Sequence, residues 1–156
     1  MRSEIRHEET HPLLVVGLNR GEALTAEAGA MVTTGGGIEI EATKSESSGM
    51  LSSLRRGTDT REAVRLVRFV AENGSGRVTL APPLPGDVVR TMVRDQSLFV
   101  VQSGSFLGAH ENVTVDATAD TEQTLRGDEG LSFLELSGSG PAFLAGYGAV
   151  EQRTLD

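Results

Sequence analysis

The 156-residue sequence has no cysteine and no tryptophan, and it has one tyrosine (Tyr147) and one lysine (Lys44). The lack of cysteine excludes disulfides, thiolate metal ligands and cysteine nucleophiles. With one tyrosine and five phenylalanines, the chain has little aromatic surface on which nucleic-acid bases could stack.

Positive charge is also scarce: the formal net charge is −8 and the pI is about 4.9. An acidic chain does not condense on phosphate backbones, so no nucleic-acid partner is expected. Many carboxylates with a single lysine suit a salt-adapted organism, such as a halophilic archaeon, or an organism with a GC-rich genome.

Long apolar runs are missing as well. No segment approaches the ~20 apolar residues needed to span a bilayer. The first residues lack the apolar core and cleavage site of a signal peptide. We therefore expect a soluble, cytoplasmic protein with an N-terminal tail at 1–11 and a single β domain at 12–156.

Glycine is abundant, with 19 residues, and it separates short apolar runs. In GIEIEAT (37–43) apolar and charged residues alternate, which is typical of a half-buried strand. Such segments predict an all-β fold of roughly a dozen strands. The other predicted strands are 12–18, 76–82, 87–94, 96–102, 111–118 and 131–136.

Two segments are less regular. Residues 61–72 fit either an amphipathic helix or a strand. Because ENGSG and then RVTLA follow, we predict a strand from about Arg65 and a β-hairpin with its turn at Gly74–Gly76. Residues 43–60 are rich in serine, glycine and charge, and we predict a long loop there.

Three segments follow one plan. Each opens with glycine and an acid, crosses a strand or hairpin, and closes with glycine before bulky apolar residues. Glycine permits the positive φ of a reversing chain, and a short carboxylate can accept turn amides. The plan predicts a β-sandwich or double-stranded β-helix-like coil with pseudo-threefold internal repeats. The openings are Gly21-Glu22, Gly86-Asp87 and Gly127-Asp128, and the closings are Gly29 with Met31-Val32, Gly104 with Phe106-Leu107, and Gly140 with Phe143-Leu144.

The first of these segments resembles the opening motif of the altered-inheritance-of-mitochondria (mitochondrial biogenesis) family. That motif reads L-x-x-G-E-x-[VL]-x-A-E-x-G-[SA]-M-[VI], and residues 18–32 match it. Later family motifs are matched in order by GRVTLAPPLPGDVV, QSGSFLGAHENVTV and LSGSGPAFLAGYGAV. The motif and turn positions carried over are Gly21, Glu22, Glu27, Gly29, Met31, Pro85, Gly86, Asp87, Gly104, Phe106, Gly138, Gly140, Tyr147 and Gly148.

The resemblance implies a fold similar to the tryptophan RNA-binding attenuation protein, with a tendency to form homo-oligomers. The family has no established enzymatic activity, and its eukaryotic members look like organisers of the mitochondrial inner membrane. The resemblance thus implies an unidentified protein partner and peripheral association with a membrane complex. The family's G-E-S segment is missing here, and the final edge of the sandwich is expected to be left open or covered by a partner subunit.

Glu22 and Glu27 are the first candidates for chemistry. Two carboxylates in one cleft could act as an acid and a base at a separation of ~5–9.5 Å. A spacing of five residues places them on opposite faces of a continuous strand unless a turn intervenes, so a structural role is the simpler hypothesis. Glu22 is matched in kind by Asp87 and Asp128, whereas Glu27 has no counterpart and is the acid to test first.

The three histidines offer weak metal hypotheses. His7 and His11 have helical ligand spacing, but Pro12 follows and no third ligand is evident. His110 lies in a predicted loop, and a cupin-type metal enzyme would need an H-x-H motif that this chain lacks. No metal site and no cofactor are expected.

The glycine-rich segments 35–37, 74–76 and 137–141 are predicted to be turns, because none opens a helix within a βαβ unit to cradle phosphate. No G-x-S-x-G elbow for a serine nucleophile is found. One basic cluster could bind an anion or an acidic partner, although a solvated face explains it as well. The cluster comprises Arg55, Arg56, Arg61, Arg65 and Arg68.

The sequence therefore predicts a non-catalytic scaffold or interaction protein that forms homo-oligomers. Two alternatives remain open. One is a cupin-like metal-dependent enzyme that uses His110, and the other is an RNA-binding module, by analogy of fold alone.

Overall fold

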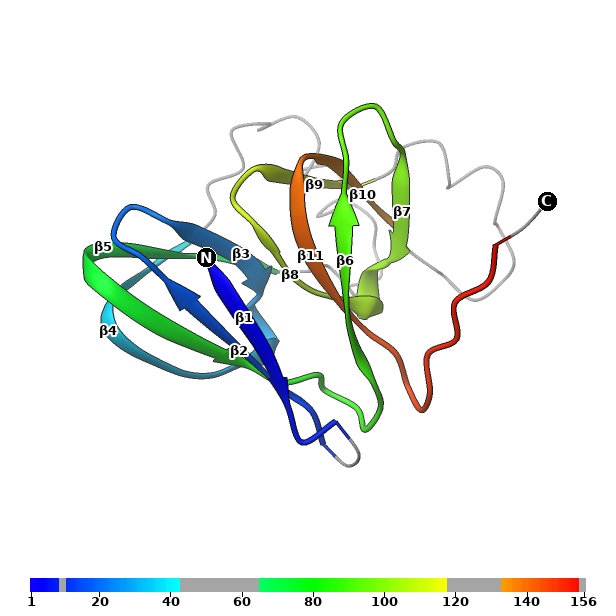
Figure 1. The fold of residues 1–156 in the computed structure, drawn as a ribbon, viewed down its shortest axis with the longest axis horizontal. Coiled ribbons are helices and arrows are strands. Elements are labelled where there is room, and N and C mark those ends of the chain that lie inside the picture. Colours follow the sequence, from blue (N-terminus) through cyan, green and yellow to red (C-terminus); the bar gives the residue numbers. More distant parts are fainter. Residues whose placement is uncertain (9–10, 43–64, 118–132, 155–156) are drawn as a thin grey trace, which may run out of the picture.

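A computed structural model describes residues 1–8, 11–42, 65–117 and 133–154. These residues form eleven β-strands and two short 3-10 turns, so the prediction of an all-β fold is confirmed (Figure 1). The predicted loop at 43–60 lies outside the described residues. The strands are β1 (Arg2–Arg6), β2 (Leu13–Leu18), β3 (Ala23–Glu27), β4 (Met31–Ala42), β5 (Leu66–Leu80), β6 (Val88–Val93), β7 (Phe99–Gln102), β8 (Phe106–His110), β9 (Val113–Ala117), β10 (Phe133–Gly138) and β11 (Gly140–Ala145), and the 3-10 turns are η1 (Ala28–Ala30) and η2 (Ser103–Ser105).

The described strands form two antiparallel sheets. The larger sheet has the order β1-β2-β5-β3-β8-β11-β6, and β4 pairs with the other edge of β5. The smaller sheet has the order β7-β10-β9. The larger sheet curls until it is nearly closed, so that its end strands β1 and β6 lie on the same side of the molecule (Figure 1). A curled sheet of this kind buries one face without any helix.

Two apolar clusters fill the interior. Alternate residues of β2 point inward, as the period of a strand requires, and they pack with β5 in the first cluster. The second cluster takes residues from all of the strands β6 to β11 and contains the buried side chains of Phe106 and Leu136. The first cluster also takes in Val88, Leu107 and Phe143, so the two halves of the chain share it.

These halves are two copies of one strand arrangement. In the first copy, β2 and β3 pair with the two ends of β5, and β4 pairs along its other edge. In the second copy, β6 pairs with β11 and β7 with β10, while β8 and β9 take the place of β4. Residues 13–42 correspond without a gap to residues 88–117, each counterpart lying 75 positions later.

Registers and turns repeat with the strands. Thr34 pairs with Val78 in the first copy, and the corresponding Ala109 pairs with Ala142 in the second. The turn before β3 and the turn before β7 close with the same hydrogen bond, of 3.0 Å and 3.1 Å respectively. In each turn a backbone N–H, that of Glu22 or Ser97, donates to the carbonyl three residues earlier. η1 and η2 also occupy equivalent positions. The molecule is therefore a tandem duplication in structure.

This duplication replaces the predicted threefold repeat in the described residues. Gly21 has a φ of 88°, but Gly86 does not have a positive φ. The residue that corresponds to Gly21 is Gln96, with a φ of 68°. Gly127-Asp128 lies outside the described residues. The two described Gly-acid pairs, Gly21-Glu22 and Gly86-Asp87, are therefore not at equivalent corners of the fold.

The predicted hairpin at 65–80 is wrong, because β5 runs through it as one strand of 15 residues. Both edges of β5 are paired over most of its length, which holds it extended where the glycines could have turned it. The glycines instead form a bulge, where four residues of β5 face only Gly37 of β4. The predicted turn at 35–37 is also wrong, because these residues lie within β4. A Cβ on Gly37 would overlap the backbone of Gly74, so the two strands approach closely there.

The N-terminal residues differ from the predicted tail. β1 pairs antiparallel with β2, with Ile5 opposite Leu14. Ile5 is half-buried and packs against the first apolar cluster, while Arg2, Glu4 and Arg6 are exposed. The alternation of exposed charge and half-buried residues makes β1 an outer strand of the larger sheet.

Candidate functional site

Glu22 stabilises the corner before β3. Its carboxylate accepts the backbone N–H of Asn19 at 2.7 Å and forms an ion pair with the Met1 ammonium. The hydrogen bond from the ammonium and the N–H of Asn19 lower the pKa of Glu22, against a smaller effect of burial. The Glu22 carboxylate is thus ionised and stabilises the corner by accepting hydrogen bonds.

Glu27 lies at the opposite end of β3. Five residues of extended strand separate the two acids by roughly 16 Å, too far for one cleft. The Glu27 carboxylate folds back over its own turn, where a Cβ on Gly29 would lie 3.0 Å from Oε1. The two acids of the opening motif are therefore not brought together.

A second corner joins two motifs that are distant in the sequence. The Asp87 N–H donates to the Gly148 carbonyl at 2.8 Å, and the Gly148 N–H donates to the Pro85 carbonyl at 3.2 Å. The Asp87 carboxylate accepts the N–H of Val150 at 3.0 Å. A Cβ on Gly86 would overlap the backbone here, so only glycine fits. The Asp87 carboxylate thus accepts a backbone N–H and has a structural role at this corner.

The remaining motif residues divide between packing and exposure. A Cβ on Gly138, which has a φ of 95°, would overlap the Asn112 carbonyl, and one on Gly140 would crowd His110. Tyr147 lies in the Asp87 corner, between Gly146 and Gly148, and is 79% exposed. A ring this exposed contributes little to packing in the described residues.

Met31 and Gly29 of the first copy correspond to Phe106 and Gly104 of the second. Phe106 is 2% exposed and Met31 is 42% exposed. Equivalent positions in the two copies thus have opposite environments.

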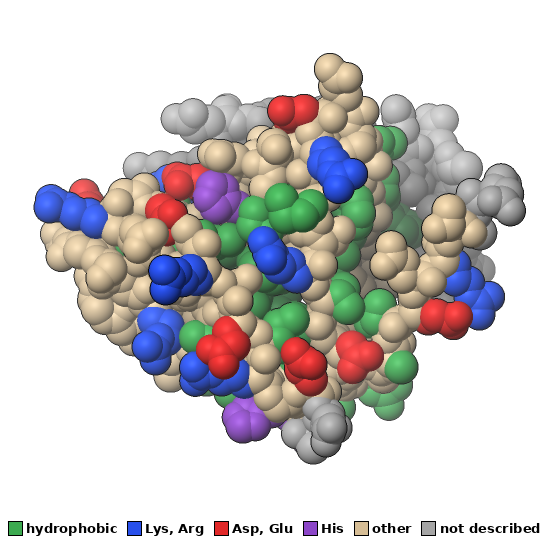
Figure 2. Space-filling model, in the orientation of Figure 1, with side chains coloured by type: hydrophobic (Ala, Val, Ile, Leu, Met, Phe, Trp, Pro, Cys, Tyr) green, Lys and Arg blue, Asp and Glu red, His purple; other side chains and the backbone are tan. Residues whose placement is uncertain are grey.

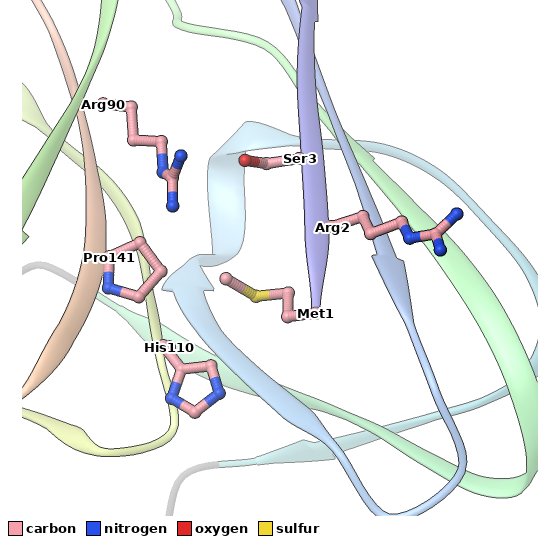
Figure 3. Close-up of a pocket in the computed structure, with 6 residues that line it drawn as sticks. All are labelled: Met1, Arg2, Ser3, Arg90, His110 and Pro141. Atoms are coloured by element: carbon pink, nitrogen blue, oxygen red, sulfur yellow. The ribbon is translucent and has the colours of Figure 1, made fainter.

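The end strands of the larger sheet enclose a groove of about 500 Å³. Figure 3 shows the side chains of Met1 and Ser3 on one side and those of Arg90 and Pro141 on the other, with His110 below. Arg2 also lines the groove. In Figure 2 hydrophobic side chains form a band near the middle of this face, with basic side chains beside it.

His110 lies at the end of β8, where its Nδ1 accepts the N–H of Asn112 at 3.2 Å. The Arg90 guanidinium, which points toward the groove in Figure 3, gives it a positive charge that favours anions. The sequence could not reveal the groove, because its residues come from four separate strands.

The other histidines are not brought together with His110. His7 is exposed in the turn after β1, with a φ of 59°. His11 lines a separate hollow beside Pro82 and Pro83. Among residues 1–8, 11–42, 65–117 and 133–154, no three histidine, aspartate or glutamate side chains lie close enough to hold a metal ion.

Two charged clusters lie along β4 and β5. Arg68 forms ion pairs with Glu41 at 3.2 Å and Glu111 at 3.4 Å. A hydrogen bond to Glu39, together with the charge of that carboxylate, raises the pKa of Glu72. Of the predicted basic cluster, Arg55, Arg56 and Arg61 lie outside the described residues, and Arg65 is exposed.

In the described part of the chain, no helix has the length and apolar character required to cross a membrane. The chain also has no match among curated proteins.

Comparison with solved structures shows a similar fold in protein SPYM3_0169 from Streptococcus pyogenes. The TM-score is 0.76 at 20% sequence identity, and the match covers 99% of this chain and 68% of that chain. The model of the mitochondrial biogenesis AIM24 family matches residues 3–156. The chain therefore belongs to the mitochondrial biogenesis AIM24 family, as its motifs had indicated.

Proposed function

We propose that the protein is a non-catalytic interaction module. It acts in the cytoplasm, binds further copies of itself and an unidentified protein partner, and associates peripherally with a membrane complex. The observation that carries the proposal is the use of the motif acids. Glu22 and Asp87 bind backbone N–H groups at two corners, and Glu27 folds over its own turn.

Exposed apolar side chains support the same proposal. Tyr147, Leu98 and Leu84 are each more than half exposed, in bends or loops beside the strands. Tyrosine is enriched at protein interfaces because its ring offers a large contact area with few rotatable bonds. The two alternatives have less support. The described residues offer no metal ligand set for a cupin-like enzyme, and a net charge of −8 disfavours RNA.

The partner surface can be tested by affinity purification from the native host. Wild-type protein, Tyr147→Ser and the control Glu151→Gln would serve as baits, followed by quantitative mass spectrometry. Glu151 is an exposed carboxylate close to Tyr147 in the sequence. We expect a partner recovered with the wild type and the control but depleted with Tyr147→Ser. A partner recovered equally by all three would contradict a role for this surface.

The non-catalytic character needs a separate test. Wild type and His110→Ala would be compared in a panel of hydrolase and metal-dependent oxygenase assays, with elemental analysis of the purified protein. We expect neither turnover nor stoichiometric metal. A turnover that His110→Ala abolishes would overturn the proposal in favour of an enzyme at the groove.

A further inference from the structure

The groove between the end strands of the larger sheet is lined by side chains whose direction the strand period sets. At the start of the chain, Met1 and Ser3 point into the groove and Arg2 points away, because successive residues of a strand face opposite sides (Figure 3). Across the groove, Arg90 of β6 lies opposite Phe143 of β11, which is fully buried. Residues opposite each other share one face of a sheet, so Arg90 belongs to the inward face of β6.

The charge of Arg90 has no counter-ion in the described structure. Its guanidinium is exposed and donates to the Met92 sulfur at 4.0 Å, which is a weak acceptor. The described residues that line the groove include no carboxylate, although the whole chain has 22 acidic residues against 14 basic ones. An arginine set apart from acids in a concave surface is suited to bind an external anion.

Two further groups of the groove can donate to the same anion. The Nδ1 of His110 accepts the N–H of Asn112 at 3.2 Å, so the neutral imidazole carries its proton on Nε2. A Cβ on Gly140 would lie 3.2 Å from the His110 Cβ, so this glycine makes room for the ring. The Ser3 hydroxyl points across the groove toward Arg90 (Figure 3). A guanidinium, a ring N–H and a hydroxyl are donors that a carboxylate accepts.

Apolar side chains form the rest of the lining. The Met1 side chain and the Pro141 ring face each other across the groove (Figure 3). Met92, which is 48% exposed, lies opposite Pro141 in the register of β6 and β11. The volume of about 500 Å³ is within the range of small-molecule sites. The lining therefore suits a small ligand with one anionic end and an apolar body.

The number of positive charges favours a carboxylate over a phosphate. Among the residues labelled in Figure 3, Arg90 supplies the one permanent side-chain charge that points into the groove. The Met1 ammonium is already paired with Glu22. A phosphate monoester carries about −1.5 to −2 charge at pH 7, so part of its charge would stay uncompensated in a chain with a net charge of −8. A carboxylate carries the single charge that Arg90 matches.

We propose that the groove binds a small aliphatic carboxylic acid in its ionised form. The carboxylate accepts hydrogen bonds from Arg90, His110 and Ser3, and the aliphatic chain lies between Met1 and Pro141. Such binding goes beyond the proposed interaction role, which rests on the motif corners and on exposed apolar side chains elsewhere. Loss of ligand binding would therefore leave that role intact, and loss of the protein partner would leave the ligand site intact.

Octanoate is the probe for this site. It would be titrated into the isotope-labelled full chain, and the amide chemical shifts of Ser3, His110 and Asn112 would report binding at the groove. Acetate lacks the aliphatic chain, 1-octanol lacks the charge, and octyl phosphate carries the other anionic head. We expect octanoate to bind with a dissociation constant of about 1 mM or lower. Each of the other three compounds should bind at least about tenfold more weakly.

Two arginine variants locate the anion. Arg90→Gln removes the charge that points into the groove. Arg2→Gln is the matched control, because it removes the same charge from an exposed arginine whose side chain points away (Figure 3). Ser3→Asp is a third variant, which places a carboxylate within the groove to repel the ligand. Circular dichroism shows that each variant folds.

We expect Arg90→Gln and Ser3→Asp to weaken octanoate binding at least about tenfold, and Arg2→Gln to change it less than about twofold. Unchanged binding in Arg90→Gln, equal losses in the two arginine variants, or shifts confined to amides outside the groove would overturn the site. Equal binding of 1-octanol would show an apolar surface without anion recognition. Tighter binding of octyl phosphate would overturn the choice of a carboxylate.

Discussion

Gly21 and Gln96 occupy the same place in two copies of one turn, 75 residues apart, and both have a positive φ, of 88° and 68°. A left-handed conformation costs an L-residue about 1–2 kcal/mol relative to glycine. The second copy tolerates this cost with a glutamine, so the turn geometry is set by the strands that it connects. The fold of the first copy therefore predicts the fold of the second, even where the residues differ.

Replacement of Gly21 tests the requirement for positive φ. No atom would lie within 4 Å of a Cβ at Gly21 or at Gly104, but only Gly21 has a positive φ. We expect Gly21→Ala to lower the free energy of unfolding by about 1 kcal/mol. Gly104→Ala should leave it unchanged or raise it slightly in chemical denaturation. Equal losses in both variants would contradict the conformational explanation.

Equivalent positions with opposite burial should differ in energetic effect. Truncation of the buried Phe106 to alanine should cost about 3–5 kcal/mol. Truncation of the exposed Met31 should cost less than about 1 kcal/mol in a single chain. Both would be measured by denaturant unfolding at low protein concentration. A large loss for Met31→Ala would show that β4 already has a cover within the chain.

Gly86 should be the least replaceable glycine of the Asp87 corner. A Cβ at this position would overlap the Gly146 carbonyl, whereas at Gly35 nothing lies within 4 Å. We expect Gly86→Ala to break the hydrogen bonds from the Asp87 N–H to the Gly148 carbonyl and from the Gly148 N–H to the Pro85 carbonyl, so that hydrogen exchange at both amides accelerates. Gly35→Ala is the control. Protected amides in Gly86→Ala would refute the close packing described for this corner.

The Glu22 ion pair predicts a pH-dependent contribution to stability. Its folded-state pKa lies below the ordinary value of 4.5. Its contribution is therefore complete above about pH 4.5 and is lost as the pH falls through the folded-state pKa. We expect Glu22→Gln to be less stable than wild type at pH 7, with a difference that shrinks below pH 4.5. A constant difference between pH 3 and pH 7 would contradict this, and Glu151→Gln should show no difference.

Alternating apolar and polar residues made the all-β class predictable from the sequence. The strand at 37–43 and that at 111–118 were recognisable because each has one charged and one apolar face. The hairpin at 65–80 was mispredicted because local glycine signals suggested a turn, whereas pairing along both edges of β5 keeps the strand extended. The conformation of such a segment is set by strands that are distant in the sequence, and a local sequence pattern does not reveal which strands these are.

The candidate site was only partly predictable. The sequence motifs identified Asp87 and Gly148, but their contact joins residues some sixty positions apart. The duplication was hidden because the copies share geometry rather than residues: Gly21 corresponds to Gln96, and Glu27 to Gln102. The threefold repeat was predicted from the recurring Gly-acid pairs. That prediction assumed a positive φ at each glycine, and Gly86 does not have one.

Disulfide trapping tests the junction between the two copies, where β3 pairs with β8, most directly, because the chain has no cysteine of its own. In this junction Ala26 of β3 lies opposite Gly108 of β8. This is a non-hydrogen-bonded pair, with an expected Cα separation of about 4.5 Å, within the range of a disulfide.

A variant that carries Ala26→Cys and Gly108→Cys would be oxidised, and its products separated without reductant. We predict that it forms a disulfide within one chain. A variant with Ala26→Cys and Ala109→Cys, which is out of register by one residue, should react far less. No disulfide in the first variant, or equal disulfide formation in both, would contradict the pairing of β3 with β8.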